Sequence, residues 1–170
     1  MRKEEFPLPV GERVRVRGDR LVMKFILTKE LGRLARWLRI LGYDAIYYDK
    51  DDRSRLVMTA LRDKRVILTR SSRMSKFTGI RMLCITEDDV EKQLAQVVKE
   101  LDLNIEEDKT FLRCVDCNES LAVIKKNEVK DKVPPYVFET QKEFKTCPVC
   151  NKIFWKGTHW QLVKEFLKCL

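Results

Sequence analysis

The chain has 170 residues, of which 44% are hydrophobic and 36% charged, with a formal net charge of +9. This length can hold one ordinary domain plus a small appendage, and the composition is typical of a globular rather than a disordered protein. No apolar run is long enough to cross a bilayer, and the N-terminus lacks the apolar core of a signal peptide. We therefore expect a protein of the reducing cytoplasm without a membrane partner.

Residues 1–22 do not have the pattern of a domain. Prolines and glycines interrupt the one short stretch in which apolar and polar residues alternate. We interpret this segment as an N-terminal extension. It is either an edge hairpin or a stretch upstream of the true start at Met23.

From Met23 onward, apolar strands and amphipathic helices alternate. Short apolar segments predict strands at residues 24–27, 44–48, 66–68 and 81–85. Apolar residues at helical spacing follow the first, second and fourth strands, and Gly42 is placed to end the first helix. This alternation is typical of a mostly parallel sheet flanked by helices. The predicted division is an α/β domain at 23–101, a charged linker at 102–112, and a small domain at 113–170 that ends in a helix.

Two cysteine pairs, Cys114-x-x-Cys117 and Cys147-x-x-Cys150, mark the small domain. Each pair fits a tight turn that directs both sulfurs to one point, and four converging thiolates form a closed, structural Zn²⁺ site. The alternatives are a redox pair or two disulfides, which a reducing compartment disfavours. The sequence therefore predicts a C-terminal zinc ribbon with Zn²⁺ as its cofactor.

Positive charge is concentrated in the α/β domain. Residues 53–81 contain nine Lys/Arg and a single acidic residue, Asp63, for a net charge of +8. This density indicates a polyanionic partner, because the neutralisation of phosphates releases counterions. The alternative is a solvated surface of the kind found in thermostable proteins.

Several longer motifs occur in a recognisable order along the chain. They lie at residues 24–27, 31–44 and 67–70, and then at 113–114, 128–135, 143–144, 147–150 and 155–159. Over about residues 23–160 the sequence resembles the Mut-seven C-terminal RNase family. The resemblance implies a PIN-like ribonuclease domain joined to a zinc ribbon.

The resemblance also implies a cluster of strand-end carboxylates that hold Mg²⁺ or Mn²⁺ and activate water. Here the chain departs from the family pattern. Thr28 stands where the first strand ends in Asp, and Ser71 replaces the acid of a Thr-Arg-Asp motif. The family pattern also has an acid at the start of the second helix. The matching position in this chain is Arg53, or Asp52 if the match shifts by one residue. Since a hydroxyl is a poor ligand and an arginine repels cations, we predict a degraded acidic metal site.

Other acidic residues remain near the predicted strand ends. If the protein is an active nuclease, the candidates for its catalytic metal site are Asp49, Asp52 and Asp88. In the competing interpretation, the acids at 51–52 and 87–89 stand at helix N-termini, where negative charge complements the helix dipole.

Hydroxyl groups and cationic side chains at the predicted strand ends can bind a phosphate directly, without a metal ion between them. On the first helix, arginines can grip an RNA backbone and Trp37 can stack on a base. The alternative for Trp37 is packing against a neighbouring element. The candidate RNA-binding residues are Arg33, Arg36, Trp37, Arg53, Arg70, Ser71, Arg73 and Lys76.

We therefore predict a PIN-like α/β protein with a C-terminal zinc ribbon that binds RNA, either structured or single-stranded. One alternative is an active metal-dependent endoribonuclease that uses Mg²⁺ or Mn²⁺. The other is a protein-interaction module that docks through the ribbon.

Overall fold

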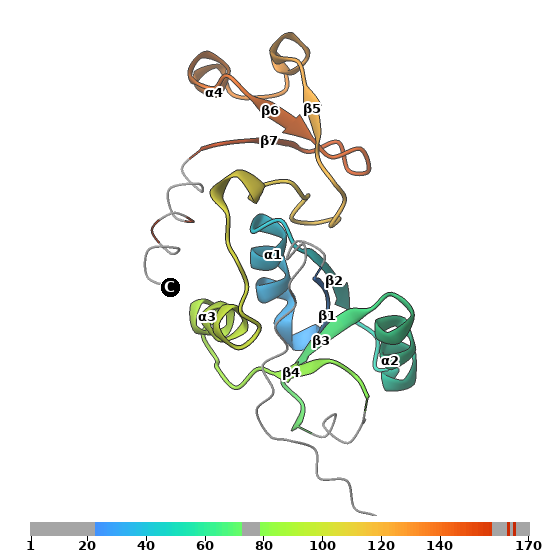
Figure 1. The fold of residues 1–170 in the computed structure, drawn as a ribbon. Coiled ribbons are helices and arrows are strands. Elements are labelled where there is room, and N and C mark those ends of the chain that lie inside the picture. Colours follow the sequence, from blue (N-terminus) through green and yellow to red (C-terminus); the bar gives the residue numbers. More distant parts are fainter. Residues whose placement is uncertain (1–22, 73–78, 158–162, 164, 166–170) are drawn as a thin grey trace, which may run out of the picture.

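The computed structural model describes residues 23–72, 79–157, 163 and 165. Its first part is a sheet with the strand order β2-β1-β3-β4 (Figure 1), in which every pairing is parallel. The strands are β1 (Lys24–Thr28), β2 (Asp44–Tyr48), β3 (Arg65–Thr69) and β4 (Met82–Cys84). The predicted α/β architecture with a mostly parallel sheet is confirmed.

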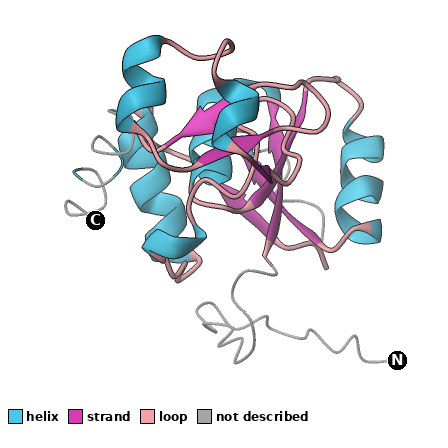
Figure 2. Ribbon diagram, turned by 90° about the horizontal axis from the view of Figure 1, so that it is seen from above, coloured by secondary structure: helices cyan, strands magenta, loops and turns pink. Residues whose placement is uncertain are grey.

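Helices cover both faces of this sheet (Figure 2). They are α1 (Gly32–Ile40), α2 (Arg53–Arg62) and α3 (Val90–Glu100), and a short 3-10 turn at Lys29–Leu31 leads into α1. Phe25 and Leu27 of β1 point toward α1 and α3, whereas Ile26 points toward α2. The side chains of alternate residues in one strand therefore pack in two separate hydrophobic cores, one on each face of the sheet. Each fully buried side chain of this size contributes about 1.5–3 kcal/mol.

Local signals in the sequence set the ends of the helices. The Asp52 and Asp89 side chains accept backbone N–H groups in the first turns of α2 and α3, respectively. Gly42 follows α1 with a φ of +89° and donates its N–H to the Arg39 carbonyl at 3.0 Å. A Cβ at Gly42 would lie 2.2 Å from the Lys109 carbonyl oxygen. This position therefore requires glycine for both its conformation and the close approach of a later segment.

The second part is a small antiparallel sheet in the order β5-β6-β7. Its elements are β5 (Ala122–Ile124), a 3-10 turn at Lys126–Val129, α4 (Pro135–Thr140), β6 (Phe144–Thr146) and β7 (Ile153–Trp155). Among the described residues, three apolar side chains are buried in its core, namely Val129, Val133 and Phe144. A core of this size is small for a segment of this length.

The predicted linker packs against the α/β domain and contains a 3-10 turn at Glu107–Lys109. The Phe111 N–H donates to the Ile40 carbonyl at 2.8 Å, and the Tyr43 hydroxyl donates to the Asn104 carbonyl at 2.8 Å. Leu103 is buried in the same core as α1 and α3. The linker therefore connects the end of α1 to the ribbon by specific contacts.

Some predicted features lie outside the described residues. These are the extension at 1–22, most of the C-terminal helix, Arg73 and Lys76. Within the described part of the chain, no helix is long and apolar enough to cross a membrane.

Candidate functional site

The carboxyl ends of β1 and β3 are neighbours from which the chain departs in opposite directions across the sheet. Such a switch point is where open α/β sheets bind their ligands. The Thr28 hydroxyl donates to the Thr69 hydroxyl at 3.4 Å, and the Thr69 hydroxyl accepts the Ser71 N–H at 3.1 Å. Neutral hydroxyls thus connect the two strand ends at this point.

Several acidic residues near this edge have partners of their own. The Asp51 carboxylate accepts from the Lys29 ammonium at 2.6 Å, and this hydrogen bond and the Lys29 charge lower the Asp51 pKa. Asp88 forms an ion pair with Arg70, and Asp52 caps α2. Among the described residues, the carboxylates do not form a group of three that could hold a metal. The structure therefore does not bring Asp49, Asp52 and Asp88 together.

The candidate RNA-binding cations in the described segments lie on α1, on α2 and after β3. Arg33 and Arg36 are exposed on α1, Arg53 is exposed in the first turn of α2, and Arg70 and Ser71 directly follow β3. The first turn of α2 and the residues after β3 both stand at the carboxyl edge of the sheet. That these side chains bind RNA stays a prediction.

Arg33 and Trp37 line two different hollows of the surface. Arg33 and Arg36 line an open cleft of about 670 Å³ between α1, β2 and residues 116–118. Trp37 is half-buried, packs against the core and lines a second, mostly apolar groove of about 490 Å³ beside Trp155, which Arg36 also lines. The contacts of Trp37 with the core agree with the alternative of packing against a neighbouring element, and its stacking on a base stays a prediction.

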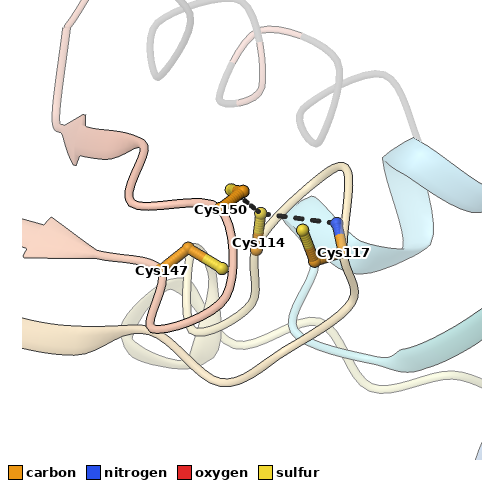
Figure 3. Close-up of side chains that lie close together, drawn as sticks. All are labelled: Cys114, Cys117, Cys147 and Cys150. Atoms are coloured by element: carbon orange, nitrogen blue, oxygen red, sulfur yellow. Dashed lines mark hydrogen bonds between the residues drawn. The ribbon is translucent and has the colours of Figure 1, made fainter.

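Four thiols form a compact cluster in the ribbon (Figure 3). The sulfur atoms of Cys114, Cys117, Cys147 and Cys150 all lie within 4.8 Å of one another. The Cys114 and Cys150 sulfurs are 3.7 Å apart. Tetrahedral Zn²⁺ with Zn–S bonds of about 2.3 Å places its sulfurs about 3.8 Å apart. The donor set and its spacing therefore fit a structural Zn²⁺ ion.

The two cysteine turns have the same shape. In each, the asparagine after the second cysteine has a positive φ, +66° at Asn118 and +56° at Asn151. Each asparagine N–H donates to the carbonyl of the first cysteine, Cys114 or Cys147, at 2.9 Å. Asparagine is one of the few residues that adopt this left-handed conformation at low cost. The shared Cys-x-x-Cys-Asn sequence thus explains the shared geometry.

The thiols influence one another's ionisation. Burial acts to raise the pKa of Cys147, but N–H groups of Cys150 and Val149 outweigh it and lower this pKa to about 7. Hydrogen bonding to Cys150 raises the pKa of Cys117 to about 12. Four thiolates this close cannot coexist without a cation, because like charges repel. Metal binding at this centre therefore releases protons.

Arg39 attaches the first cysteine turn to the sheet. Its side chain is 6% exposed, and its Nε donates to the Ala45 carbonyl at 2.8 Å. One terminal nitrogen donates to the Val115 carbonyl at 2.8 Å and to the Asp116 carbonyl at 3.0 Å. One buried guanidinium thus joins α1, β2 and the metal-binding turn.

Asn118 makes a second attachment to β2. Its side-chain oxygen accepts the Ala45 N–H at 3.0 Å, and its side-chain nitrogen donates to Asp44 at 2.7 Å. Asp44 also accepts two hydrogen bonds from Arg65, at 2.7 and 3.1 Å. The sequence analysis missed Arg39, Asn118 and Asp44. The available signal was the asparagine that follows each cysteine pair.

The Asp44 contacts predict a pH-dependent contribution to stability. Burial acts to raise the Asp44 pKa, but hydrogen bonds from Arg65 and Asn118 outweigh it, and the pKa is lowered. The contribution is therefore fully present above the unfolded-state pKa of about 4 and is lost as the pH falls through the lower folded-state value. We expect Asp44→Asn to reduce the free energy of unfolding by about 2–4 kcal/mol at pH 7. Urea denaturation at several pH values measures this.

Asp63→Asn is the matched control for that experiment. Asp63 also lies beside Arg65, at 3.7 Å, but it is more exposed and pairs mainly with Arg62. Its loss should change the free energy of unfolding by less than about 1 kcal/mol. Equal effects of the two substitutions at pH 7, or an Asp44→Asn effect that persists unchanged at pH 3, would contradict the assignment.

The fold and the thiol cluster define the class of this protein: a parallel α/β domain joined to a small antiparallel ribbon with a four-cysteine centre. The family model described as the Mut7-C RNAse domain matches residues 23–167, and the chain belongs to this family. The resemblance recognised in the sequence is confirmed. No curated protein and no solved structure matches the chain.

Proposed function

We propose that the protein binds RNA at the carboxyl edge of its parallel sheet, without metal-dependent cleavage, and that Zn²⁺ in the ribbon has a structural role. The observation that carries this proposal is the neutral hydroxyl network at the switch point, where Thr28 meets Thr69. The family membership indicates RNA as the polyanion. Since the cysteines must stay reduced to hold zinc, the protein belongs in a reducing compartment such as the cytoplasm.

The carboxyl edge of the sheet offers a divalent cation few converging carboxylates. Mg²⁺ and Mn²⁺ need several oxygen ligands, carboxylates among them, to replace part of their hydration shell. At this edge, Thr28 and Ser71 are neutral, and Asp51 and Asp88 are paired with Lys29 and Arg70. Asp49 and Asp52 are further carboxylates near this edge, but the described carboxylates do not gather into a group of three.

Exposed arginines near the carboxyl edge of the sheet favour RNA as the ligand. Arg53 is exposed at the start of α2, where the helix dipole also favours an anion. Arg33 and Arg36 extend the positive surface along α1. Together with the +8 segment at 53–81, they provide the contacts that phosphates of one RNA strand require.

We expect RNA binding to weaken steeply as salt increases. If the protein neutralises about four phosphates of single-stranded RNA, log K against log salt should have a slope near −3. Arg53→Gln should flatten the slope by about 0.7, because Arg53 is exposed and the variant would neutralise one phosphate fewer. Fluorescence anisotropy with a labelled RNA at several salt concentrations measures this. Lys99→Gln, which removes an exposed cation from the last turn of α3, should leave the slope unchanged.

The same preparation tests for cleavage. We expect the RNA to remain intact in Mn²⁺. The family match itself favours the alternative of an active metal-dependent endoribonuclease. Cleavage that disappears with EDTA and with Asp52→Asn would establish that alternative, and asparagine at this position can still cap α2. Binding that is indifferent to salt would instead favour protein docking through the ribbon.

A further inference from the structure

The cleft between α1, β2 and the first cysteine turn is lined by none of the switch-point residues Thr28, Thr69 and Ser71. Its volume of about 670 Å³ is within the range of ligand sites, about 300–1,000 Å³. One wall is formed by α1, another by the edge strand β2, and the third by residues 116–118 of the metal-binding turn. The cleft therefore exists in this shape only when the ribbon is docked on the sheet.

Tyr47 presents an aromatic ring to this cleft. The side chain is 44% exposed, and its hydroxyl donates to the Lys29 carbonyl at 2.9 Å. A Cβ at Gly32 would lie 3.3 Å from the ring, so the absence of a side chain at Gly32 leaves room for the ring in this position. Because the hydroxyl hydrogen bond already restrains the ring, a flat ligand can stack on it with little loss of conformational freedom.

Arginine side chains line the cleft. Arg33 and Arg36 are exposed at its rim, and Arg39 lies at its base. Asp116, the acidic residue among the described lining side chains, forms ion pairs with Lys152 and with Arg36, the latter at 3.4 Å. Cys117 also lines the cleft, and its thiolate would carry negative charge when the cluster holds Zn²⁺, so an anionic ligand would be attracted by the exposed arginines at the rim.

We infer that this cleft receives one unpaired nucleotide of a single-stranded RNA, with its base stacked on Tyr47 and the flanking phosphates on Arg33 and Arg36. The inference rests on the proposed RNA binding and extends it to a second subsite. Stacking on an aromatic ring is tolerant of base identity and adds to the contribution of phosphate contacts. It also gives the zinc centre a part in RNA binding, since the metal-binding turn forms one wall.

The test uses the full-length, zinc-loaded protein and a short single-stranded RNA that contains 2-aminopurine. Tyr47→Ala should weaken binding by roughly 5- to 150-fold, with little change in the salt slope. It should also remove the quenching of 2-aminopurine fluorescence that stacking causes. Tyr47→Phe keeps the ring and should bind within about twofold of the wild type. Tyr136→Ala, which removes a tyrosine that is 74% exposed in α4, should have no effect.

A second measurement needs no substitution. Photo-cross-linking of the wild-type protein to a 5-bromouridine RNA should label the tryptic peptide 40–50 at Tyr47. Wild-type protein that fails to bind RNA would refute the proposed function as a whole. Wild-type protein that binds in a salt-dependent way while Tyr47→Ala binds equally well would refute the cleft and leave the sheet-edge proposal standing. Cross-links found only in other peptides would also overturn the inference.

Discussion

Cys147→Ser should remove zinc from the protein and unfold the ribbon over residues 113–157. Among its described residues, the ribbon core has three buried apolar side chains, Val129, Val133 and Phe144, which together contribute at most about 5–9 kcal/mol. Binding of a structural zinc contributes about 10–16 kcal/mol in comparable small domains. The metal is therefore expected to provide most of the ribbon's stability. Metal analysis should give one zinc per wild-type chain and none in the variant.

Hydrogen exchange locates the effect of Cys147→Ser. Ribbon amides should lose protection, whereas the amides of β1 and β3 should keep it, because two cores of their own cover these strands. The Ala45 amide should lose protection as well, since its acceptor is the side chain of Asn118. Cys84→Ser is the control, because Cys84 is a free thiol on β4 outside the cluster. A wild type without zinc, or a fully protected ribbon in the variant, would refute the metal assignment.

Arg39→Ala should destabilise the whole chain by about 3–5 kcal/mol, because three carbonyl groups lose a charged donor. The apolar part of the side chain is also lost from a buried position, which adds to the effect. We expect lower protection of Ala45 and of residues 115–116, and weaker zinc binding. Chemical denaturation and a zinc-chelator competition measure the two effects.

Arg36→Ala is the matched control, one turn earlier on the same helix. Its guanidinium is exposed and makes one ion pair, at 3.4 Å with Asp116. The cost should be below about 1 kcal/mol. If Arg36→Ala and Arg39→Ala destabilise the protein equally, the bridging role assigned to Arg39 is wrong.

The strands and helices of the α/β domain were predictable because their signals are local. Apolar runs located the ends of β1 to β4 to within one residue. Asp52 before α2 and Asp89 before α3 proved to be caps, in agreement with one of the two interpretations. The cluster of four cysteines was predictable because the spacing of each pair reflects the geometry of a single turn.

The contacts between the two parts of the chain were not predictable in the same way. In the sequence, Arg39 resembles the exposed cations of a basic helix. In the structure it is buried and donates to the carbonyls of Val115 and Asp116, which follow it by more than 70 positions. Two interpretations of Trp37 stayed open, because spacing along one helix does not reveal which element packs against each side. Such contacts depend on how elements distant in sequence meet, which no local pattern encodes.

The Asn118 side chain also has a consequence for solubility. β2 is an edge strand, and an uncovered edge with free N–H groups is a template for pairing with strands of other molecules. The cysteine turn occupies part of that edge through the Ala45 N–H. If the cysteine cluster holds zinc, we expect loss of the metal to loosen this turn and to expose the edge of β2 to strands of other molecules. Metal supply and resistance to aggregation would then be linked through a single asparagine.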